Sequence, residues 1–379
     1  MSVVIGTVGG LALTEVLLAS VLYFSDGTWI WNRSTEAMPH QARVENPYRE
    51  STSVFHPFFG YVARPSTGLN SSHEVSPDGF FNPGQILPLE NDPARYDIVI
   101  IGGSVAAGLG VIERSSGIIS KRLESLPQLA GKKVNLINLA QGGYQFPTPL
   151  MIISYYSALG QNFDAILLVD GFNEAWNLSK PDRLIIPGWW ERLARVFNAD
   201  VDRAFTEKWR DILISKSKQS RIAVHSVTLA AIAASLPNLK DDNVQFYYTP
   251  PGALLDKLSP STLAQSWKRQ IIQIDKMKSN DTIFIHFLQP THHLESNGIS
   301  FENKYSETIK QNYPLLIENQ NQLKRMGINT YSMIGVFGTD YHTQRQYYQD
   351  ECCHPTLKGY DILLNFMAEK LAYEIQPPL

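Results

Sequence analysis

The chain has 379 residues, of which 44% are hydrophobic and 18% are charged. Such a composition supplies a packed core and excludes both a disordered chain and a small disulfide scaffold. Lys and Arg number 33 against 36 Asp and Glu, so the formal net charge is −3, without the basic excess that neutralises a phosphate backbone. We therefore expect no nucleic acid partner, and the length leaves room for one large or two ordinary domains.

An apolar segment, residues 3–24, lies at the N-terminus, and its length matches the roughly 20 residues that cross a bilayer. Its one charged residue is Glu15, which costs about 2–3 kcal/mol inside a membrane. Aromatic residues suited to the headgroup level lie at its end or just beyond, namely Tyr23, Phe24, Trp29 and Trp31. We expect residues 1–25 to form a membrane anchor or signal-anchor helix, with a buried apolar helix as the alternative.

Residues 26–93 are rich in Pro, Gly, Ser and Asn, which predicts an irregular lead-in packed on the main domain. Over residues 94–379, short apolar runs alternate with helical stretches, as in βαβ units of α/β proteins. The predicted strands are residues 97–101, 134–139, 165–169, 282–288 and 328–334, and the predicted helices are 105–123, 150–159, 262–277, 307–324 and 357–374. This order indicates a doubly wound, five-stranded parallel sheet with a helical insertion at about residues 176–261.

The first predicted strand leads into Gly102-Gly103-Ser104, at the sheet edge where open α/β proteins bind ligands. One interpretation is a dinucleotide-binding turn, which would make the chain a nucleotide-cofactor oxidoreductase. That fingerprint has a glycine where Ser104 stands, and it needs an acidic residue after the second strand, where the chain has residues 138–141, Asn-Leu-Ala-Gln. The other interpretation makes Ser104 a nucleophile at a helix N-terminus, where the dipole favours developing negative charge. A helix-capping serine without a catalytic role is the third.

Residues that could assist Ser104 follow the next two strands. Gly143 follows the second strand and Asn173 the third, so a parallel sheet brings both to the edge that holds Ser104. A glycine N–H and an asparagine amide are suitable oxyanion donors, each worth roughly 3–4 kcal/mol when pre-aimed. The sequence therefore predicts an oxyanion hole at this edge.

A candidate general base precedes the last predicted helix. His354 has two acidic residues upstream, Asp350 and Glu351, and a carboxylate holds a catalytic imidazole in the right tautomer. Either acid could serve from these residues alone. We therefore interpret Ser104, His354 and one of the two acids as a catalytic triad.

With these residues the sequence resembles the SGNH (GDSL-type) esterase and lipase family. Its first block is similar to residues 102–104 with Gly108, and its second-block glycine corresponds to Gly143. Its third block, Gly-x-Asn-Asp, is similar to residues 171–174, and its last, Asp-x-x-His-Pro, to residues 351–355. The resemblance covers residues 96–375 approximately, and it implies a flavodoxin-like three-layer sandwich.

The chain departs from the family pattern at three acidic positions. Gly103 stands where the family has Asp, and Glu174 and Glu351 each replace an Asp. By family position Glu351 is the expected partner of His354, whereas Asp350 has the usual residue type one position earlier. The departures also keep open a catalytically silent binding module on the same fold.

The resemblance implies acyl transfer through an acyl-enzyme on Ser104. His354 would take the hydroxyl proton, and the N–H groups of Ser104 and Gly143 with the Asn173 amide would hold the oxyanion. The expected substrate is an ester-bearing small molecule, lipid or glycan, with water or a sugar hydroxyl as acceptor, and no cofactor or metal. Arginines after the apolar segment nominally favour a cytoplasmic body, but similarity to secreted members implies a membrane-anchored, extracytoplasmic (periplasmic) one.

Further candidates receive plainer interpretations. His292 and His293 follow the fourth strand and are expected to line the substrate cleft, because no other ligand lies at metal-binding spacing. His286, within an apolar strand, is expected to be a core residue. The adjacent Cys352 and Cys353 are either packed thiols or a vicinal disulfide, depending on the compartment.

Overall fold

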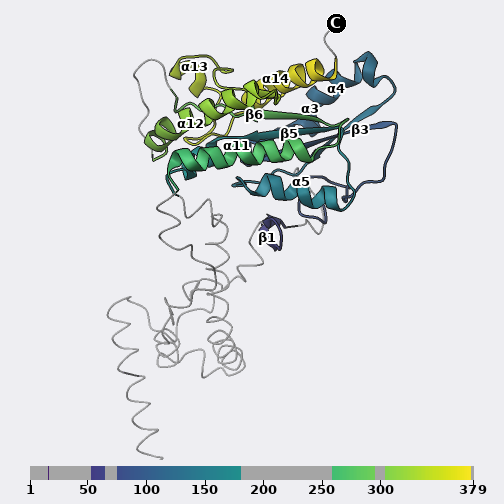
Figure 1. Cartoon of the computed structure of the whole chain (residues 1–379), viewed down its shortest axis with the longest axis horizontal. Coiled ribbons are helices and arrows are strands. Elements are labelled where there is room, and N and C mark those ends of the chain that lie inside the picture. The colour runs from purple at the N-terminus through teal and green to yellow at the C-terminus, as the bar shows by residue number, and fades with distance from the viewer. Residues whose placement is uncertain (1–15, 17–52, 65–74, 181–257, 295–303, 377–379) are drawn as a thin grey trace, which may run out of the picture. The chain divides into compact units, whose positions relative to one another are not determined.

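A computed structural model describes residues 16, 53–64, 75–180, 258–294 and 304–376 of the chain (Figure 1). Apart from Val16, these residues belong to one compact unit, Thr52–Trp190 with Thr249–Leu379. Its centre is a five-stranded, fully parallel sheet in the order β4-β3-β5-β6-β7. The strands are β3 (Arg95–Gly102), β4 (Lys133–Asn138), β5 (Ala165–Asp170), β6 (Ile283–Leu288) and β7 (Thr330–Ser332). The predicted doubly wound sheet is therefore confirmed, since this is the flavodoxin-like strand order.

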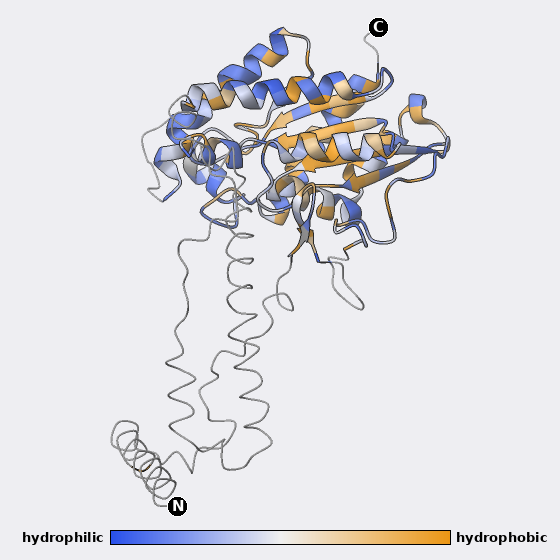
Figure 2. Cartoon of the chain, turned by 60° about the horizontal axis from the view of Figure 1, so that its bottom comes forward, coloured by the Kyte–Doolittle hydropathy of each residue, from blue (hydrophilic) through white to orange (hydrophobic). Residues whose placement is uncertain are grey.

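Helices cover both faces of the sheet, because its strands are apolar on both sides. Val99 and Ile101 of β3 point to the layer that contains α5 (Thr148–Ala158), α11 (Pro260–Met277) and α12 (Ser306–Arg325). Ile98 and Ile100 point to the layer of α3 (Ser104–Ser116), α4 (Ile118–Glu124) and α14 (Leu357–Ile375). Figure 2 shows the strands as the most hydrophobic part of this three-layer arrangement.

The single helix predicted at residues 105–123 is two helices in the structure. Gly117 separates α3 from α4 and has φ +62°, a left-handed conformation that glycine adopts without strain. The Glu113 carboxylate accepts hydrogen bonds from the N–H groups of Ile119 (2.9 Å) and Ser120 (2.9 Å). These bonds satisfy donors at the start of α4 and stabilise the break, which apolar periodicity does not reveal.

The lead-in is more regular than the sequence indicates. It contains an antiparallel hairpin of β1 (Ser53–His56) and β2 (Gly60–Ala63), and Phe59 and Val62 pack into the core layer of α5. Phe80 and Leu87, farther along the lead-in, also belong to this core cluster.

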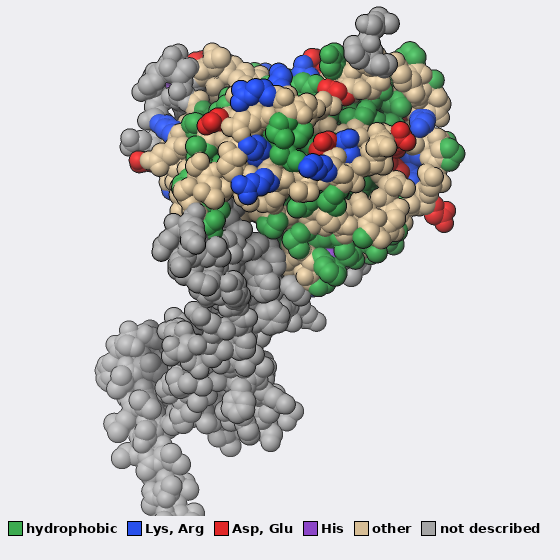
Figure 3. Space-filling model, in the orientation of Figure 1, with side chains coloured by type: hydrophobic (Ala, Val, Ile, Leu, Met, Phe, Trp, Pro, Cys, Tyr) green, Lys and Arg blue, Asp and Glu red, His purple; other side chains and the backbone are tan. Residues whose placement is uncertain are grey.

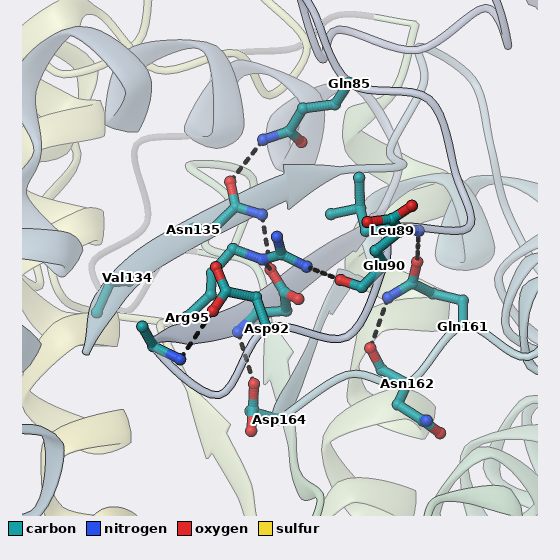
Figure 4. Close-up of polar contacts among 12 residues, drawn as sticks. Gln85, Leu89, Glu90, Asp92, Arg95, Val134, Asn135, Gln161, Asn162 and Asp164 are labelled. Atoms are coloured by element: carbon teal, nitrogen blue, oxygen red, sulfur yellow. Dashed lines mark hydrogen bonds and ion pairs between the residues drawn. The ribbon is translucent and has the colours of Figure 1, made fainter.

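A polar cluster joins the end of the lead-in to the N-terminal end of the sheet (Figure 4). Gln85 donates to Asn135 Oδ1 (2.6 Å), and the Leu89 N–H donates to Gln161 Oε1 (2.7 Å). The Arg95 guanidinium donates to Asp97 (2.7 Å) and to the carbonyl of Glu90 (2.8 Å). Polar contacts thus cover the N-terminal ends of the strands, while the candidate site lies at their C-terminal ends.

Several predictions of the sequence lie outside the described residues or only partly within them. The insertion expected at about residues 176–261 is described only up to residue 180 and from residue 258 onward, and α11 begins at Pro260. The expected anchor, residues 1–25, falls outside the description except for Val16. Among the described helices, none combines the length and apolarity that a membrane crossing requires.

Surface charges of both signs are interspersed over the described part of the face shown in Figure 3. This distribution agrees with the near balance of acidic and basic residues in the whole chain.

Candidate active site

The register of the sheet brings the ends of its central strands to one edge. Ile100 pairs with Asn138 of β4, and Gly102 pairs with Val169 of β5. The last residues of β3, β4 and β5 therefore lie side by side at the carboxyl edge of the sheet, and the turns that follow these strands begin there. Polar residues in these turns can converge despite their separation in the sequence.

Ser104 is the first residue of α3 and lies directly beyond the end of β3. The turn needs Gly102, which has φ +138° and lies so close to the Val169 carbonyl that a side chain would collide with it. The first N–H groups of an α-helix have no acceptor within the helix, so Ser104 sits in a field that favours negative charge.

The His354 ring meets the Ser104 hydroxyl, with Nε2 2.7 Å from Oγ. The loop that holds His354 leads directly into α14, which packs against α3. Gly108 of α3 makes this approach possible, because a Cβ there would overlap the side chain of Tyr360. Gly108 therefore has a packing role, which brings the histidine loop over the start of α3.

The carboxylate that partners His354 is Asp350, whose Oδ2 accepts a hydrogen bond from His354 Nδ1. Its other oxygen, Oδ1, accepts the backbone N–H groups of Cys352 (3.0 Å), Cys353 (3.0 Å) and His354 (3.1 Å). Burial pushes the pKa of Asp350 upward, but its hydrogen bonds with His354 and with the backbone outweigh that effect. The pKa of Asp350 therefore lies below its usual value.

The expectation from family position that Glu351 partners His354 is corrected by this geometry. Glu351 is exposed, whereas Asp350 folds its carboxylate back over the three N–H groups that follow. A short acidic side chain that caps successive backbone donors is a common turn motif, and here it leaves Oδ2 directed at the imidazole ring.

Asn173, one of the expected oxyanion donors, lies against the turn that carries Ser104. A Cβ at Gly103 would lie 2.6 Å from Asn173 Nδ2, so the amide is packed against the turn that carries Ser104. The same nitrogen donates to the carbonyl of Tyr144 (2.9 Å), which fixes the orientation of the amide. This contact also gives a reason for glycine at position 103, where the family has Asp, since a side chain there would displace Asn173.

The glycine turn after β4 faces Ser104 from the other side. A Cβ at Gly142 would lie 4.0 Å from Ser104 Cβ, and Gly143 follows with φ +81°. The left-handed conformation at Gly143 reverses the chain within the turn. The structure thus brings together Ser104, His354 and Asp350, with Asn173 and the Gly142–Gly143 turn close by.

Two tyrosines that the sequence analysis does not predict at the site form a chain of hydrogen bonds to this turn. Tyr61 of β2 donates its hydroxyl to the Gly142 carbonyl, and Tyr144 donates its hydroxyl to the Tyr61 carbonyl. Burial raises the pKa of Tyr144 well above its usual value, so its phenol stays a donor. No sequence pattern pairs Tyr61 with a turn some 80 positions away, so tertiary structure alone reveals the contact.

A buried polar network lies beneath the Asn173 turn. Asp170, the last residue of β5, accepts hydrogen bonds at Oδ2 from Trp267 (2.9 Å) and pairs through Oδ1 with His286 Nε2 (2.9 Å). His286 Nδ1 contacts Thr330 Oγ1 (2.7 Å), which links β5, β6 and β7. The prediction that His286 is a satisfied core residue is confirmed, since its side chain is fully buried.

Glu174, next to Asn173, caps the helix that carries both residues. Its Oε2 accepts the N–H of Gly171 (2.8 Å) at the start of α6 (Phe172–Asn177), and its Oε1 accepts the N–H of Phe146 (3.3 Å). Burial and the nearby charge of Asp170 raise the pKa of Glu174 to about 8, although the backbone hydrogen bonds oppose the rise. Glu174 therefore ties the Asn173 turn to the loop after Gly143.

His292 and His293 lie beneath the histidine loop and not along an open cleft. They are 2% and 3% exposed, and burial lowers the pKa of His292 to about 3 and also lowers the pKa of His293. The His293 ring contacts the Cys352 carbonyl through Nε2 (3.0 Å) and Ser306 Oγ through Nδ1 (3.2 Å). The expectation that they line a substrate cleft is therefore corrected by their burial, and His293 instead contacts the loop that carries His354.

The dinucleotide interpretation lacks its acidic residue in the structure as well. The second strand, β4, ends at Asn138, which is fully buried and donates to the Ala107 carbonyl (3.0 Å). The Asn138 side chain thus joins β4 to α3 and is directed into the core. A ribose partner at this position is therefore not provided by β4.

No family model matches the chain, and no curated protein matches it. Solved structures with similar folds include a lipase/acylhydrolase from Enterococcus faecalis, with 11% identity, coverage of 75% of this chain and 99% of that one, and a TM-score of 0.37. A GDSL-like lipase from Bacteroides thetaiotaomicron has 10% identity, coverage of 74% and 89%, and a TM-score of 0.37. A catalytic mutant of Axe2, an acetylxylan esterase from Geobacillus stearothermophilus, has 11% identity, coverage of 75% and 95%, and a TM-score of 0.36. At these values the likeness concerns the fold, and the activity has to be argued from the geometry of the site.

Proposed function

We propose that the chain is a serine ester hydrolase of the SGNH type. The observation that carries the proposal is the continuous hydrogen-bonded line from Asp350 through His354 to the Ser104 hydroxyl. A serine, an imidazole and a carboxylate in this order form the arrangement that activates a hydroxyl for attack on an acyl group. Structural capping alone does not require such a line, because a capping serine bonds to its own helix.

In the proposed mechanism His354 takes the Ser104 proton at Nε2 as Oγ attacks the ester carbonyl carbon. Asp350 accepts a hydrogen bond from Nδ1–H of His354 and stabilises the imidazolium that forms. The imidazolium then gives its proton to the leaving alcohol, which leaves an acyl-enzyme on Ser104. Water, activated by the neutral imidazole, attacks this ester and releases the carboxylic acid.

The oxyanion formed in each step is proposed to bind to three donors, namely the N–H groups of Ser104 and Gly143 and the side-chain amide of Asn173. Asn173 uses one amide hydrogen on the Tyr144 carbonyl, and an asparagine amide has two. The second hydrogen is the one available to the oxyanion. A fixed amide costs little reorganisation when charge develops, which is the source of its catalytic benefit.

The acyl donor and acceptor are proposed at the level of chemical class. An ester on a glycan, a lipid or a small molecule fits the chemistry, and a sugar hydroxyl in place of water would turn hydrolysis into transfer. Membrane attachment through residues 1–25, with the catalytic domain on the extracytoplasmic side, remains part of the proposal, and it rests on the apolar N-terminal sequence and the family resemblance.

The test is turnover of p-nitrophenyl acetate by the purified chain and two variants. Ser104→Ala and His354→Ala should each lower kcat/KM by at least about 10³-fold, because triad members act as a unit. Ser115→Ala is the matched control, since Ser115 is exposed at the far end of the same helix and should leave turnover unchanged. Turnover that survives in Ser104→Ala would refute the assignment.

A further inference from the structure

The triad loop contains two adjacent cysteines whose sulfur atoms are held together. The Sγ atoms of Cys352 and Cys353 lie 2.6 Å apart, and both residues carry free thiols. Neighbouring side chains in an extended chain point to opposite sides, so the loop conformation itself places both sulfurs on one side. A disulfide bond is roughly 2.05 Å long and needs a Cβ–S–S–Cβ dihedral near 90°, so closure requires a sulfur shift of about half an ångström together with a twist of the peptide unit between the two residues.

The pair is in direct contact with the catalytic apparatus. Its sulfur atoms and a ring nitrogen of His354 all lie within 4.8 Å of one another. The backbone N–H groups of the same two cysteines donate to Asp350 Oδ1 at 3.0 Å each. A twist of the Cys352–Cys353 peptide unit therefore alters the hydrogen bond from the Cys353 N–H, one of those that direct Asp350 toward His354.

We propose that Cys352 and Cys353 form an oxidisable vicinal dithiol that lowers catalysis when it closes to a disulfide. The inference rests on the proposed function of the Ser104–His354–Asp350 site. The reagent class is a low-molecular-weight disulfide such as oxidised glutathione, which accepts the two electrons.

The exchange proceeds in two balanced steps. The half-buried Cys352 thiolate attacks one sulfur of the oxidant, which releases one thiol and leaves a mixed disulfide on Cys352. Cys353 then loses its proton and attacks Cys352 Sγ, which forms the intramolecular bond and releases the second thiol. Cys352 is the expected first nucleophile, because contact with Cys352, burial and the charge of Asp350 raise the pKa of the Cys353 thiol well above its usual value.

Closure changes the triad through the backbone and not through the substrate site. The new bond completes an eight-membered ring that includes the Cys352–Cys353 peptide unit and its Cys353 N–H, whereas the Cys352 N–H lies outside the ring. A twist of that unit turns the Cys353 N–H away from Asp350 Oδ1, so the two N–H groups no longer both point at the carboxylate. Asp350 then loses part of its support, and the His354 ring loses its orientation toward Ser104. A misplacement of about 1 Å at a catalytic group costs on the order of 10²-fold in rate.

The experiment uses the full chain, which has no cysteines besides this pair, so every thiol effect maps to it. Reduced protein is desalted, incubated with oxidised glutathione and divided for intact mass, iodoacetamide labelling and turnover of p-nitrophenyl acetate. We expect a mass loss of about two hydrogens, disappearance of both labelling sites, and a fall in kcat of roughly 10- to 100-fold with KM unchanged. Dithiothreitol should restore all three.

The variant Cys352→Ser keeps the backbone donors but cannot close the ring, so the ratio of its kcat with and without oxidant should be one. Two thiols that persist in the oxidant, a glutathione adduct that never closes, or a disulfide that leaves kcat unchanged would each overturn the inference. Failure of the proposed function gives a different result. The reduced chain would then show no Ser104-dependent turnover, whether or not the oxidised chain has lost two hydrogens in mass.

Discussion

Asp350 controls the orientation of His354 through a carboxylate with two distinct tasks. One oxygen accepts three successive backbone N–H groups, and the other accepts His354 Nδ1. Because these bonds hold the pKa of Asp350 below its usual value, the carboxylate is ionised at neutral pH. The imidazolium of the proposed mechanism would therefore meet a charged partner.

The two acids of the loop should differ when each is neutralised. Asp350→Asn should lower kcat on the order of 10³- to 10⁴-fold, because an amide can hold the wrong imidazole tautomer. Glu351→Gln, the matched control, should change kcat by less than about twofold, since its exposed side chain is not the one that meets His354. Steady-state kinetics on the two variants decide the matter, and a larger loss for Glu351→Gln would overturn the assignment of the acid.

The raised pKa of Glu174 predicts that the free energy of unfolding depends on pH. Its pKa is raised to about 8 in the folded chain, against an ordinary value near 4.5, so the folded state binds a proton that the unfolded state releases. This contribution is complete below about pH 4.5 and is lost as the pH rises toward 8, on the order of 1 kcal/mol per pH unit.

Glu174→Gln should remove that loss, because glutamine does not titrate. Urea unfolding at several pH values measures the effect. The free energy of unfolding of the unmodified chain should fall relative to that of the variant between about pH 5 and pH 8. Parallel pH profiles for the two proteins would contradict a proton held by Glu174.

At the scale of single residues, the sequence predicted which side chains gather at the sheet edge but not which acid meets His354. Ser104, Gly143, Asn173 and His354 follow strand ends or precede a helix, and parallel strands bring such positions to one edge. The choice between Asp350 and Glu351 depends on how four residues of loop fold. A spacing rule cannot express a carboxylate that curls back over its own backbone.

The hairpin of β1 and β2 is the element that links the lead-in to the site. Tyr61 reaches from β2 to the Gly142 carbonyl, and a Cβ at Gly143 would lie 2.8 Å from its hydroxyl. The tyrosine thus packs against the turn that carries the proposed oxyanion donor. Its hydroxyl is a positioning group, because it acts on the Gly142–Gly143 turn and not on the reacting atoms.

Tyr61→Phe should lower kcat by roughly 2- to 10-fold with little change in KM, which corresponds to the loss of one hydrogen bond of about 0.5–1.5 kcal/mol. Tyr155→Phe is the control, because Tyr155 packs against the same hairpin through Phe59, at 5.2 Å between ring centroids. Steady-state kinetics on both variants, with melting temperatures measured in parallel, separates positioning from stability. Equal losses in kcat for the two variants would assign the hairpin a purely structural role.

Elements with a clear pattern of apolar residues were predicted well. Elements whose position depends on tertiary contacts were not. All five strands of the parallel sheet were located, and the three central ones, β3, β5 and β6, are apolar runs buried on both faces. The edge strand β7 is shorter than the predicted residues 328–334, and its Ser332 is exposed. The β1–β2 hairpin was missed, since its short strands acquire their burial only against α5. The break at Gly117 was missed because the apolar period continues through it.

For the molecule as a whole, the sheet supports the site through its interior. The network of Asp170, Trp267, His286 and Thr330 is buried and ties three strands and α11 together directly beneath the Asn173 turn. Fully satisfied buried polar networks rigidify their surroundings, since each group would be costly to leave unpaired. The oxyanion turn therefore rests on a fixed base, which preorganised donors need.

The general architecture could be predicted from the sequence because the order of strands and helices admits few topologies. The strand order and the shared carboxyl edge follow from that limitation. Packing beneath the edge could not be predicted. His292 and His293 lie at the right strand end but turn inward, where burial among Phe172, Tyr305 and Tyr348 determines their position.

The central claim is that Ser104 is an activated nucleophile, and a fluorophosphonate probe tests it without knowledge of the substrate. Peptide mass mapping of the labelled chain should find the phosphonate on Ser104, in an amount that approaches one per chain. Labelling should be lost in Ser104→Ala and slowed by at least about 10²-fold in His354→Ala, because the imidazole supplies the general base. A chain that stays unlabelled, or that is labelled equally well without His354, would contradict the account.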